Sequence, residues 1–148
     1  METIIRPATM DDAKRVWEIR NDPAVRRNSS NQDVIQLENH LGWFENKYFN
    51  QEGNFCFVLE LGSEVIGYCR YDQDDAGNLV VSIALDSIYH GRGLGFLLLA
   101  RTIEHLPMGG RILATVLKNN PASFRIFEKQ GFETINEDGQ SFHMQKEI

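Results

Sequence analysis

The sequence lacks any apolar run close to the roughly 20 residues that a membrane-spanning helix requires. Its first residues, METIIRPATMDDAKR, also lack an apolar stretch long enough for a secretory signal. These two absences lead us to expect a cytoplasmic protein with no membrane partner.

Basic residues and cysteines are also scarce. Lys and Arg together number 15 against 21 Asp and Glu, which gives a net charge of −6. Binding to nucleic acid needs a basic surface for the phosphates, so this charge argues against a nucleic-acid partner. Cys56 and Cys69 stand in apolar segments without the close spacing of metal ligands, and we expect buried free thiols and no metal site.

Internal repeats and linker-like stretches are missing as well, and a chain of 148 residues suits one hydrophobic core. We therefore expect a single domain, residues 1–148. The apolar fraction of 42% and the charged fraction of 24% are ordinary for a globular fold. They leave the oligomeric state, monomer or homodimer, open.

The hydrophobic pattern predicts both strands and helices. A short strand at Thr3 to Arg6 precedes a helix from Met10 to Arg20, which Thr9 caps and Asn21-Asp22-Pro23 ends. Apolar residues three and four positions apart predict a second helix from Asp33 to Tyr48. The later segments are strands at 55–60, 65–71, 79–85 and 111–117, a loop at 72–78, helices at 93–106 and 121–129, and a hairpin of 132–136 with 141–146. This order implies an α+β fold with a mixed sheet and helices on both faces.

The most informative segment joins the strand Leu79 to Leu85 to a helix through the glycine-rich turn His90-Gly91-Arg92-Gly93-Leu94-Gly95. The first amides of a helix lack intrahelical acceptors, and the helix dipole adds positive potential at that end. Glycines let the backbone approach a bulky anion, so the turn suits a pyrophosphate, with Arg92 as a further positive charge. A Walker loop is excluded because no Gly-Lys-Ser/Thr occurs, and Phe96 stands where a dinucleotide-binding fold has glycine.

This turn resembles a signature of the GCN5-related N-acetyltransferase (GNAT) family, Gln/Arg-x-x-Gly-x-Gly/Ala. A second segment, Asn120 to Phe132, is similar to a later motif of the same family, and the order of elements matches over nearly the whole chain. The resemblance implies a three-layer α/β/α fold around a largely antiparallel GNAT-type sheet of about seven strands. Its parallel fourth and fifth strands, at 79–85 and 111–117, would splay apart. The resemblance further implies an acetyl-CoA-dependent N-acetyltransferase.

The same resemblance implies where acetyl-CoA binds. It would lie between the splayed strands, and Asn120 would contact it. Asn120 is explained equally well as a helix N-cap, and the two roles are compatible. The backbone groups implied for the pantetheine arm are those of Ile83, Ala84 and Leu85, and the amides implied for the pyrophosphate are those of Gly91, Arg92, Gly93, Leu94, Gly95 and Phe96.

Three positions depart from the family pattern. Phe127 stands where many members have the Tyr that protonates the departing thiol, Thr115 where some have a Glu base, and His90 replaces the first Gln or Arg. A thiol with a pKa near ~8.5 leaves as a thiolate without an acid. Positioning and backbone amides would then carry most of the catalysis. The catalytic residues stay unassigned, with His40 as a candidate base.

The N-terminal half is expected to shape the acceptor pocket. Arg20-Asn21-x-Pro, followed by a His-x-x-aromatic-Phe helix at His40, resembles the branch that acetylates nucleotide-linked amino sugars, including the altrosamine acetyltransferase of pseudaminic acid synthesis. The resemblance implies that Arg20, Asn21 and His40 line a pocket for a small-molecule amine. Structural alternatives stay open: Arg20 at its helix C-terminus, and His40 and Trp43 as packed residues. A protein N-terminus or small amine as acceptor, and a non-catalytic acyl-CoA-binding module, also stay open.

Overall fold

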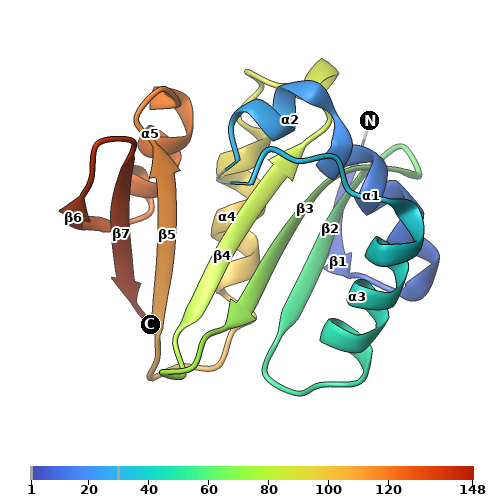
Figure 1. The fold of residues 1–148 in the computed structure, drawn as a ribbon, viewed down its shortest axis with the longest axis horizontal. Coiled ribbons are helices and arrows are strands. Elements are labelled where there is room, and N and C mark those ends of the chain that lie inside the picture. The colour runs from blue at the N-terminus through green and yellow to red at the C-terminus, as the bar shows by residue number, and fades with distance from the viewer. Residues whose placement is uncertain (1, 30) are drawn as a thin grey trace.

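The computed structural model describes residues 2–29 and 31–148. Its strands form a seven-stranded sheet in the order β1-β2-β3-β4-β5-β7-β6, in which β4 and β5 are parallel and the other neighbours antiparallel. Helices lie on both faces of this sheet (Figure 1), so the expected mixed α+β architecture is confirmed. The elements are β1 (Thr3–Pro7), α1 (Ala13–Asn21), α2 (Pro23–Arg27), α3 (Leu37–Phe49), β2 (Phe55–Leu61), β3 (Glu64–Gln73), β4 (Leu79–Leu85), α4 (Leu94–Ile103), β5 (Arg111–Leu117), α5 (Pro121–Lys129), β6 (Glu133–Glu137) and β7 (Ser141–Glu147).

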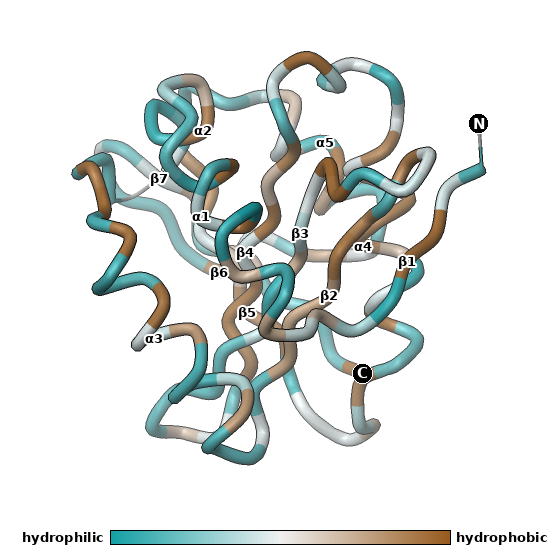
Figure 2. The backbone as a smooth tube through the Cα atoms, turned by 90° about the vertical axis from the view of Figure 1, so that its right-hand side faces the viewer, coloured by the Kyte–Doolittle hydropathy of each residue, from teal (hydrophilic) through white to brown (hydrophobic). Residues whose placement is uncertain are grey.

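Each face of the sheet has its own apolar core, because successive side chains of a strand point to opposite faces. On one face, Val16 of α1 and Phe44 of α3 pack with Tyr68 of β3. On the other face, Leu98 of α4 packs in a cluster with Ile112 of β5. Figure 2 shows hydrophobic residues concentrated along the central strands and on alternate turns of α3. The two cores divide the molecule into an α1–α3 side and an α4–α5 side.

An extra helix, α2, follows α1 directly. The sequence predicted that Asn21-Asp22-Pro23 ends a helix, and it does, but the same residues also begin another. Pro23 occupies the first turn of α2, where its missing N–H costs nothing. The Asp22 carboxylate accepts a hydrogen bond from the amide of Ala24 at 2.9 Å. The residues that end α1 thus also form the N-cap of α2.

Several predicted boundaries were wrong: α4 ends at Ile103 and not at 106, and two other shifts move residues near the site. Helix α3 begins at Leu37, four residues later than expected, and Val34 lies outside it with 59% of its surface exposed. Strand β3 continues to Gln73, so Asp72 belongs to the sheet and not to a solvated loop. Its carboxylate accepts a 2.6 Å hydrogen bond from Tyr48 and pairs with Arg70. Two half-buried partners therefore stabilise a strand end that the polar composition of the segment did not predict.

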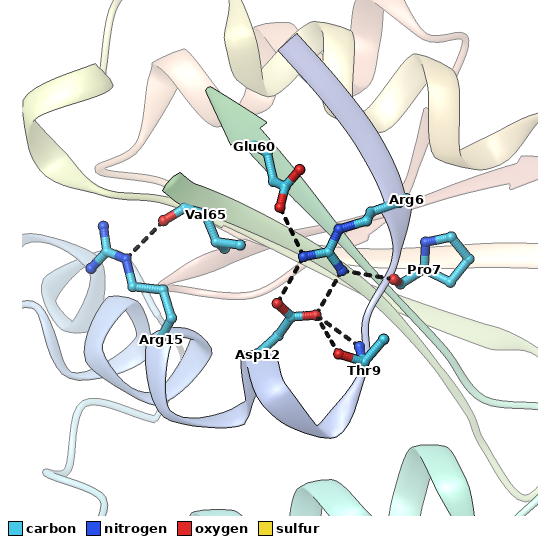
Figure 3. A network of polar contacts seen from close by, with 7 residues as sticks. All are labelled: Arg6, Pro7, Thr9, Asp12, Arg15, Glu60 and Val65. Carbon is cyan, nitrogen blue, oxygen red and sulfur yellow. Dashed lines mark hydrogen bonds and ion pairs between the residues drawn. The ribbon is translucent and has the colours of Figure 1, made fainter. Parts of the chain in front are cut away.

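Arg6 ties the start of the first helix to the sheet (Figure 3). Its guanidinium donates to both carboxylate oxygens of Asp12, at 2.8 and 2.9 Å, and to Glu60 at 3.0 Å. Burial would raise the pKa of Asp12, but Arg6 and the amide of Thr9 hold it below its ordinary value. In the next turn, Arg15 Nε donates to the carbonyl of Val65 at 2.7 Å. These contacts fix α1 over the sheet and thereby place its last turn.

Cys56 and Cys69 are free and buried, as expected from the sequence. Burial raises the pKa of both thiols, that of Cys69 to about 11. Across the described parts of the chain, no helix combines the length and apolarity needed to cross a membrane.

Candidate active site

Strands β4 and β5 are paired only at their beginnings. Leu79 lies opposite Ile112 and Val80 opposite Leu113, and beyond these residues the two strands separate. The ribbons of β4 and β5 diverge toward the upper end of Figure 1. From Val81 onward, the edge of β4 that faces β5 has no paired strand among the described residues. An unpaired strand edge offers N–H and C=O groups to an extended ligand.

The glycine-rich turn lies at the open end of this gap. Gly91 and Gly93 have φ values of +79° and +76°, in the left-handed region that favours glycine. Gly93 is the N-cap of α4, so the amides of Leu94, Gly95 and Phe96 meet no capping side chain. A Cβ added at Gly91 or Gly93 would meet no atom within 4 Å. Open space, unpaired amides and the positive end of the helix dipole together fit a pyrophosphate.

Gly95 has a different role from the other two glycines. It is buried, and an added Cβ would lie 3.1 Å from Cδ1 of Ile126 and 3.7 Å from Cδ1 of Leu85. The missing side chain therefore lets α4 pack closely against α5 and the end of β4. Packing requires this glycine, whereas the sequence suggested only the approach of an anion.

The turn is anchored to the N-terminal helices. The Asp86 carboxylate forms an ion pair with Arg15 of α1, with Oδ2 2.7 Å from Nη2. Ser87 donates to the carboxylate of Asp22 at 2.9 Å, at the junction of α1 and α2. These two contacts couple the segment before the glycine-rich turn to α1 and to the junction of α1 and α2.

Two exposed side chains of the turn differ in their contacts within the protein. His90 Nε2 lies 2.9 Å from the carbonyl of Leu85, so this nitrogen carries the proton and closes the turn. Arg92 is exposed, with its guanidinium 5.3 Å from the centroid of the Tyr89 ring. Arg92 is therefore available to a phosphate, whereas the structure gives His90 a structural contact.

Asn120 lies across the gap, between β5 and α5. Its Oδ1 accepts a hydrogen bond from the amide of Ser123 at 3.2 Å, which makes it the N-cap of α5. Within the described residues its Nδ2 donates to no group. The capping role is thus observed, and the amide nitrogen is available to a ligand.

Phe127 belongs to the core of the α4–α5 side. Only 3% of its surface is exposed, and its ring lies edge-on to Phe132 with centroids 5.0 Å apart. Its side chain presents no proton donor and contributes packing.

Arg20 and His40 are paired on the α1–α3 side. Arg20 Nη1 lies 3.0 Å from His40 Nδ1, and His40 Nε2 lies 2.8 Å from the carbonyl of Ala13. A carbonyl only accepts, so Nε2 carries the proton and Nδ1 accepts from Arg20. Burial, followed by the charge of Arg20, lowers the pKa of His40 to about 4. His40 is 1% exposed and has both nitrogens engaged, so this arrangement leaves it no free nitrogen for an amine.

Asn21 also makes contacts within the protein. Its Nδ2 donates to the carbonyl of Ile35 at 2.7 Å, and its Oδ1 accepts from the amide of the same residue at 2.9 Å. The Trp17 indole donates to that carbonyl as well, at 2.7 Å. Asn21 therefore holds the segment before α3 against α1.

Arg70 and Trp43 complete this side of the site, and sequence reasoning did not single out Arg70. The guanidinium carbons of Arg20 and Arg70 lie 4.3 and 5.2 Å from the centroid of the Trp43 ring. Arg70 pairs with Asp72, yet its Nε is buried and has no hydrogen-bond partner among the described residues. A charged residue inside the apolar run VIGYCRY was the available signal, because alternation places it on the same face as Tyr68.

Two hollows in the surface lie apart from the gap. One of about 440 Å³ is bounded by Tyr48, Asn54 and His105, and another of about 510 Å³ by Asn78 and Arg111. Neither includes a residue of the glycine-rich turn. In the described ranges, no group of three or more His, Cys, Asp or Glu side chains is arranged to hold a metal ion.

Comparison with known families matches residues 2–133 to the family described as Acetyltransferase (GNAT) domain. Comparison with curated proteins gives no match. Among solved structures, a ribosomal-protein-alanine N-acetyltransferase from Brucella melitensis is 26% identical, with a TM-score of 0.80 over 98% of this chain and 99% of that one.

Two further solved structures contain acetyl-CoA. A putative acetyltransferase from Salmonella typhimurium with its cofactor acetyl-CoA is 22% identical, with a TM-score of 0.82 over 99% of this chain and 94% of that one. A phosphinothricin acetyltransferase from Sinorhizobium meliloti in complex with acetyl-CoA is 20% identical, with a TM-score of 0.84 over 99% and 88% of the two chains. At these identities the likeness shows the fold.

Proposed function

Because the chain belongs to the GNAT acetyltransferase family, it is an acetyl-CoA-dependent N-acetyltransferase, and we propose that its acceptor is the primary amine of a nucleotide-linked amino sugar. The amine attacks the acetyl group directly while both substrates are bound. The proposal divides the site into a cofactor half, built by β4, α4 and α5, and an acceptor half, built by α1, α3 and β3.

The cofactor half consists of the residues that fit acetyl-CoA, which supplies the acetyl group as an activated thioester. Backbone groups of β4 from Ile83 to Leu85 hold the pantetheine arm along the unpaired strand edge. The amides from Gly91 to Phe96 and the exposed Arg92 bind the pyrophosphate. Asn120 contributes its free Nδ2 from the other side of the gap.

The observation that carries the acceptor proposal is a half-buried arginine without a carboxylate partner. Among the described residues, no Asp or Glu oxygen lies within 4.0 Å of the Arg20 guanidinium. Burial and the charge of Arg70 lower the pKa of Arg20, but a guanidinium stays charged at neutral pH. An unpaired charge away from water costs free energy. A phosphate oxygen of the acceptor would offset this cost through the fork of donors that arginine presents.

The charge around Trp43 supports the same conclusion. Arg20 and Arg70 both contact its ring. Asp72 balances the charge of Arg70, so the charge of Arg20 is left in excess. This local excess contrasts with the net charge of −6 for the chain. An acceptor with negative charge would be attracted to this part of an otherwise acidic protein.

The chemistry of the reacting groups also suits an amino sugar. Neighbouring oxygen substituents lower the basicity of a sugar amine, so more of it is neutral and ready to attack at pH 7 than of a lysine side chain with a pKa near ~10.4. The leaving thiolate needs no acid, which agrees with a buried Phe127. Positioning by Arg20 would then contribute through the geometry of attack.

A protein N-terminus is the second candidate acceptor. Its support is the 26% identity, over nearly the full length of both chains, to the ribosomal-protein-alanine N-acetyltransferase. An N-terminal α-amine has a pKa near ~7.7–8.0, low enough to react without a strong base. This candidate leaves the charge excess at Arg20 unexplained unless the protein substrate presents an acidic residue.

Thiol release from acetyl-CoA, measured over a panel of acceptors, tests the proposal. The panel contains UDP-glucosamine, glucosamine 6-phosphate, spermidine and an octapeptide that begins with alanine. We expect UDP-glucosamine to give a kcat/KM at least 10-fold above the unphosphorylated amines. Robust turnover of the peptide, with none of a nucleotide-linked amino sugar, would refute the acceptor assignment and leave the acetyltransferase activity standing.

We also propose a cytoplasmic location. The free, buried thiols of Cys56 and Cys69 are compatible with a reducing compartment. Fractionation of cells that produce the tagged protein tests this, and recovery of the protein outside the cytoplasmic fraction would contradict it.

A further inference from the structure

Three polar side chains are linked in a series of hydrogen bonds on the face of the sheet that α4 and α5 do not cover. Thr115 of β5 has its Oγ1 3.3 Å from Nδ1 of His143 on β7. His143 Nε2 lies 3.1 Å from Oδ2 of Asp138, in the turn between β6 and β7. Thr115 and Asp138 are exposed and His143 is half-buried, so solvent reaches the group.

The partners of His143 determine where its proton lies. Two backbone amides of the turn, those of Gln140 and Ser141, bond Asp138 at 2.8 Å each. The Gln140 amide, His143 and the Ser141 amide lower the pKa of Asp138 to about 2, so the carboxylate is ionised and only accepts. His143 Nε2 therefore carries the proton, and Nδ1 is free to accept from the Thr115 hydroxyl. A hydroxyl, an imidazole base and an orienting carboxylate stand in sequence.

The position of Thr115 links this group to the gap. It lies two residues beyond Leu113, the last residue of β5 that pairs with β4. Ala114 and Val116 point into the core of the α4–α5 side, so Thr115 points to the opposite face. That is the face on which α1 and α3 build the acceptor half.

The sheet register aligns Thr115 with the cationic group across the gap. On β4, Ser82 lies two residues beyond Val80, as Thr115 does beyond the matching residue of β5. Ser82 pairs with Arg70 on β3, and Thr115 pairs with His143 on β7. Arg70 and His143 thus lie on opposite sides of the gap, each one strand away from it, and on the same face of the sheet.

We propose that Thr115 and His143 form the proton relay for the acetyl transfer, with Asp138 as the positioning residue. As the acceptor nitrogen bonds to the acetyl carbon, Thr115 Oγ1 takes the proton that the nitrogen loses and passes its own proton to His143 Nδ1. The carbon–sulfur bond breaks with its electron pair on sulfur, and the thiolate leaves. Asp138 stabilises the imidazolium, which then releases the proton to water. This relay rests on the N-acetyltransferase activity and not on the identity of the acceptor.

The chemistry explains why a threonine can stand where some relatives have a glutamate. A hydroxyl alone is too weak a base, but a hydroxyl bonded to a neutral imidazole transfers a proton without a free charge. The charged group that contacts His143 is Asp138. The cross-strand partners of His143, which are Asn136 and Thr115, are neutral. Glu137, which pairs with Phe142 in the sheet, forms its ion pair with Lys118. A merely structural role, in which His143 braces the hairpin, predicts no effect on the proton-transfer step.

The tautomer of His143 is the first test, and it needs no acceptor. Nitrogen NMR of the imidazole, assigned with His143→Gln, should show the neutral ring protonated on Nε2 and unprotonated on Nδ1. Thr115→Val should change the Nδ1 shift because it removes the donor. A neutral His143 that carries its proton on Nδ1 would overturn the relay.

Kinetic measurements then distinguish a role of His143 in proton transfer from a purely structural role in the β6–β7 hairpin. On UDP-glucosamine, or on the alanine-initiated octapeptide if only that is acetylated, Thr115→Val and His143→Gln should lower kcat by about 100-fold or more, in the range for general-base catalysis. Both should also change the dependence of kcat on pH, whereas Thr115→Ser, the matched control, should keep kcat within about 3-fold and keep the wild-type pH dependence. A Thr115→Val enzyme with an unchanged kcat, an unchanged dependence of kcat on pH and wild-type thermal unfolding would refute the proposal. Peptide turnover that depends on Thr115 would support the relay while rejecting the amino-sugar acceptor.

Discussion

Arg20 and His40 meet in a 3.0 Å hydrogen bond between Nη1 and Nδ1, in which an uncharged histidine orients a charged arginine. The histidine is held in turn by the carbonyl of Ala13, at 2.8 Å from its Nε2. Because the partner of Arg20 carries no charge, the positive charge of the guanidinium is left for a ligand. The helices α1 and α3 thus together position one guanidinium group that can bind an anion.

Replacing Arg20 by alanine tests this group. If Arg20 binds a phosphate of the acceptor, Arg20→Ala should raise KM for UDP-glucosamine by about 10- to 100-fold, in line with the loss of a charge-assisted hydrogen bond. The affinity for acetyl-CoA, measured by calorimetry, should stay within about 2-fold. Arg27→Ala removes an exposed arginine of the next helix and serves as the control. An equal loss of acetyl-CoA binding in Arg20→Ala would assign the residue to the cofactor half instead.

His40 should make the stability of the protein depend on pH. Its folded pKa of about 4 lies below the unfolded value near ~6.5, so the unfolded chain takes up the proton first. The contribution of His40 to the free energy of unfolding is present above pH 6.5 and is lost as the pH falls from 6.5 towards 4. The loss amounts to about 2 kcal/mol by pH 5. Urea unfolding at pH 7 and pH 5 measures the drop. His40→Gln should lose this part of the drop, whereas His105→Gln, at an exposed histidine, should retain it.

The two kinds of glycine in the turn should respond differently to substitution. Gly93→Val places a side chain in the open space before the first amides of α4, at a φ of +76°, and should weaken acetyl-CoA binding at least 10-fold. Gly77→Val imposes the same left-handed strain at a φ of +83° in a distant loop and should leave binding unchanged. Calorimetry on both variants measures the difference. Equal affinities in folded Gly93→Val and wild-type protein would remove the pyrophosphate from this turn.

Gly95→Ala should destabilise the fold because its Cβ would lie 3.1 Å from Cδ1 of Ile126. Ile126→Val removes that methyl group, so the double variant should recover much of the lost thermal stability. Thermal unfolding of the two single variants and the double variant provides the measurement. If the second substitution rescues nothing, the packing of α4 against α5 does not determine the choice of glycine here.

Phe127→Ala should affect stability and not proton transfer. Removing a buried aromatic ring costs about 3–5 kcal/mol of unfolding free energy, and Phe127→Leu should cost less. The shape of the rate–pH curve should be the same in both variants and the wild type. A loss limited to one limb of that curve would mean that a water molecule beside residue 127 donates a proton to the thiolate.

Local patterns in the sequence predicted the order of strands and helices, the glycine-rich turn and the cap at Asn120. Each depends on residues within a few positions of one another: the period of apolar residues, or an Asn followed by Pro. The family signatures, which lie in the same segments, were recognisable for that reason. The prediction was weakest at boundaries, where Asp72 joined a strand because Tyr48 and Arg70 bond its carboxylate.

Tertiary structure alone decided the partners of the side chains. Arg20 meets His40 across 20 positions, Ser87 meets Asp22 across 65, and Thr115 meets His143 across 28. No local period predicts such pairs, because they depend on the register of β5 with β7 and on how α1 and α3 cross the sheet. The sequence by itself determined where the glycine-rich turn would form. The packing of distant elements determined that His40 would be buried and bonded through both ring nitrogens, and that Thr115 would meet His143 on the neighbouring strand.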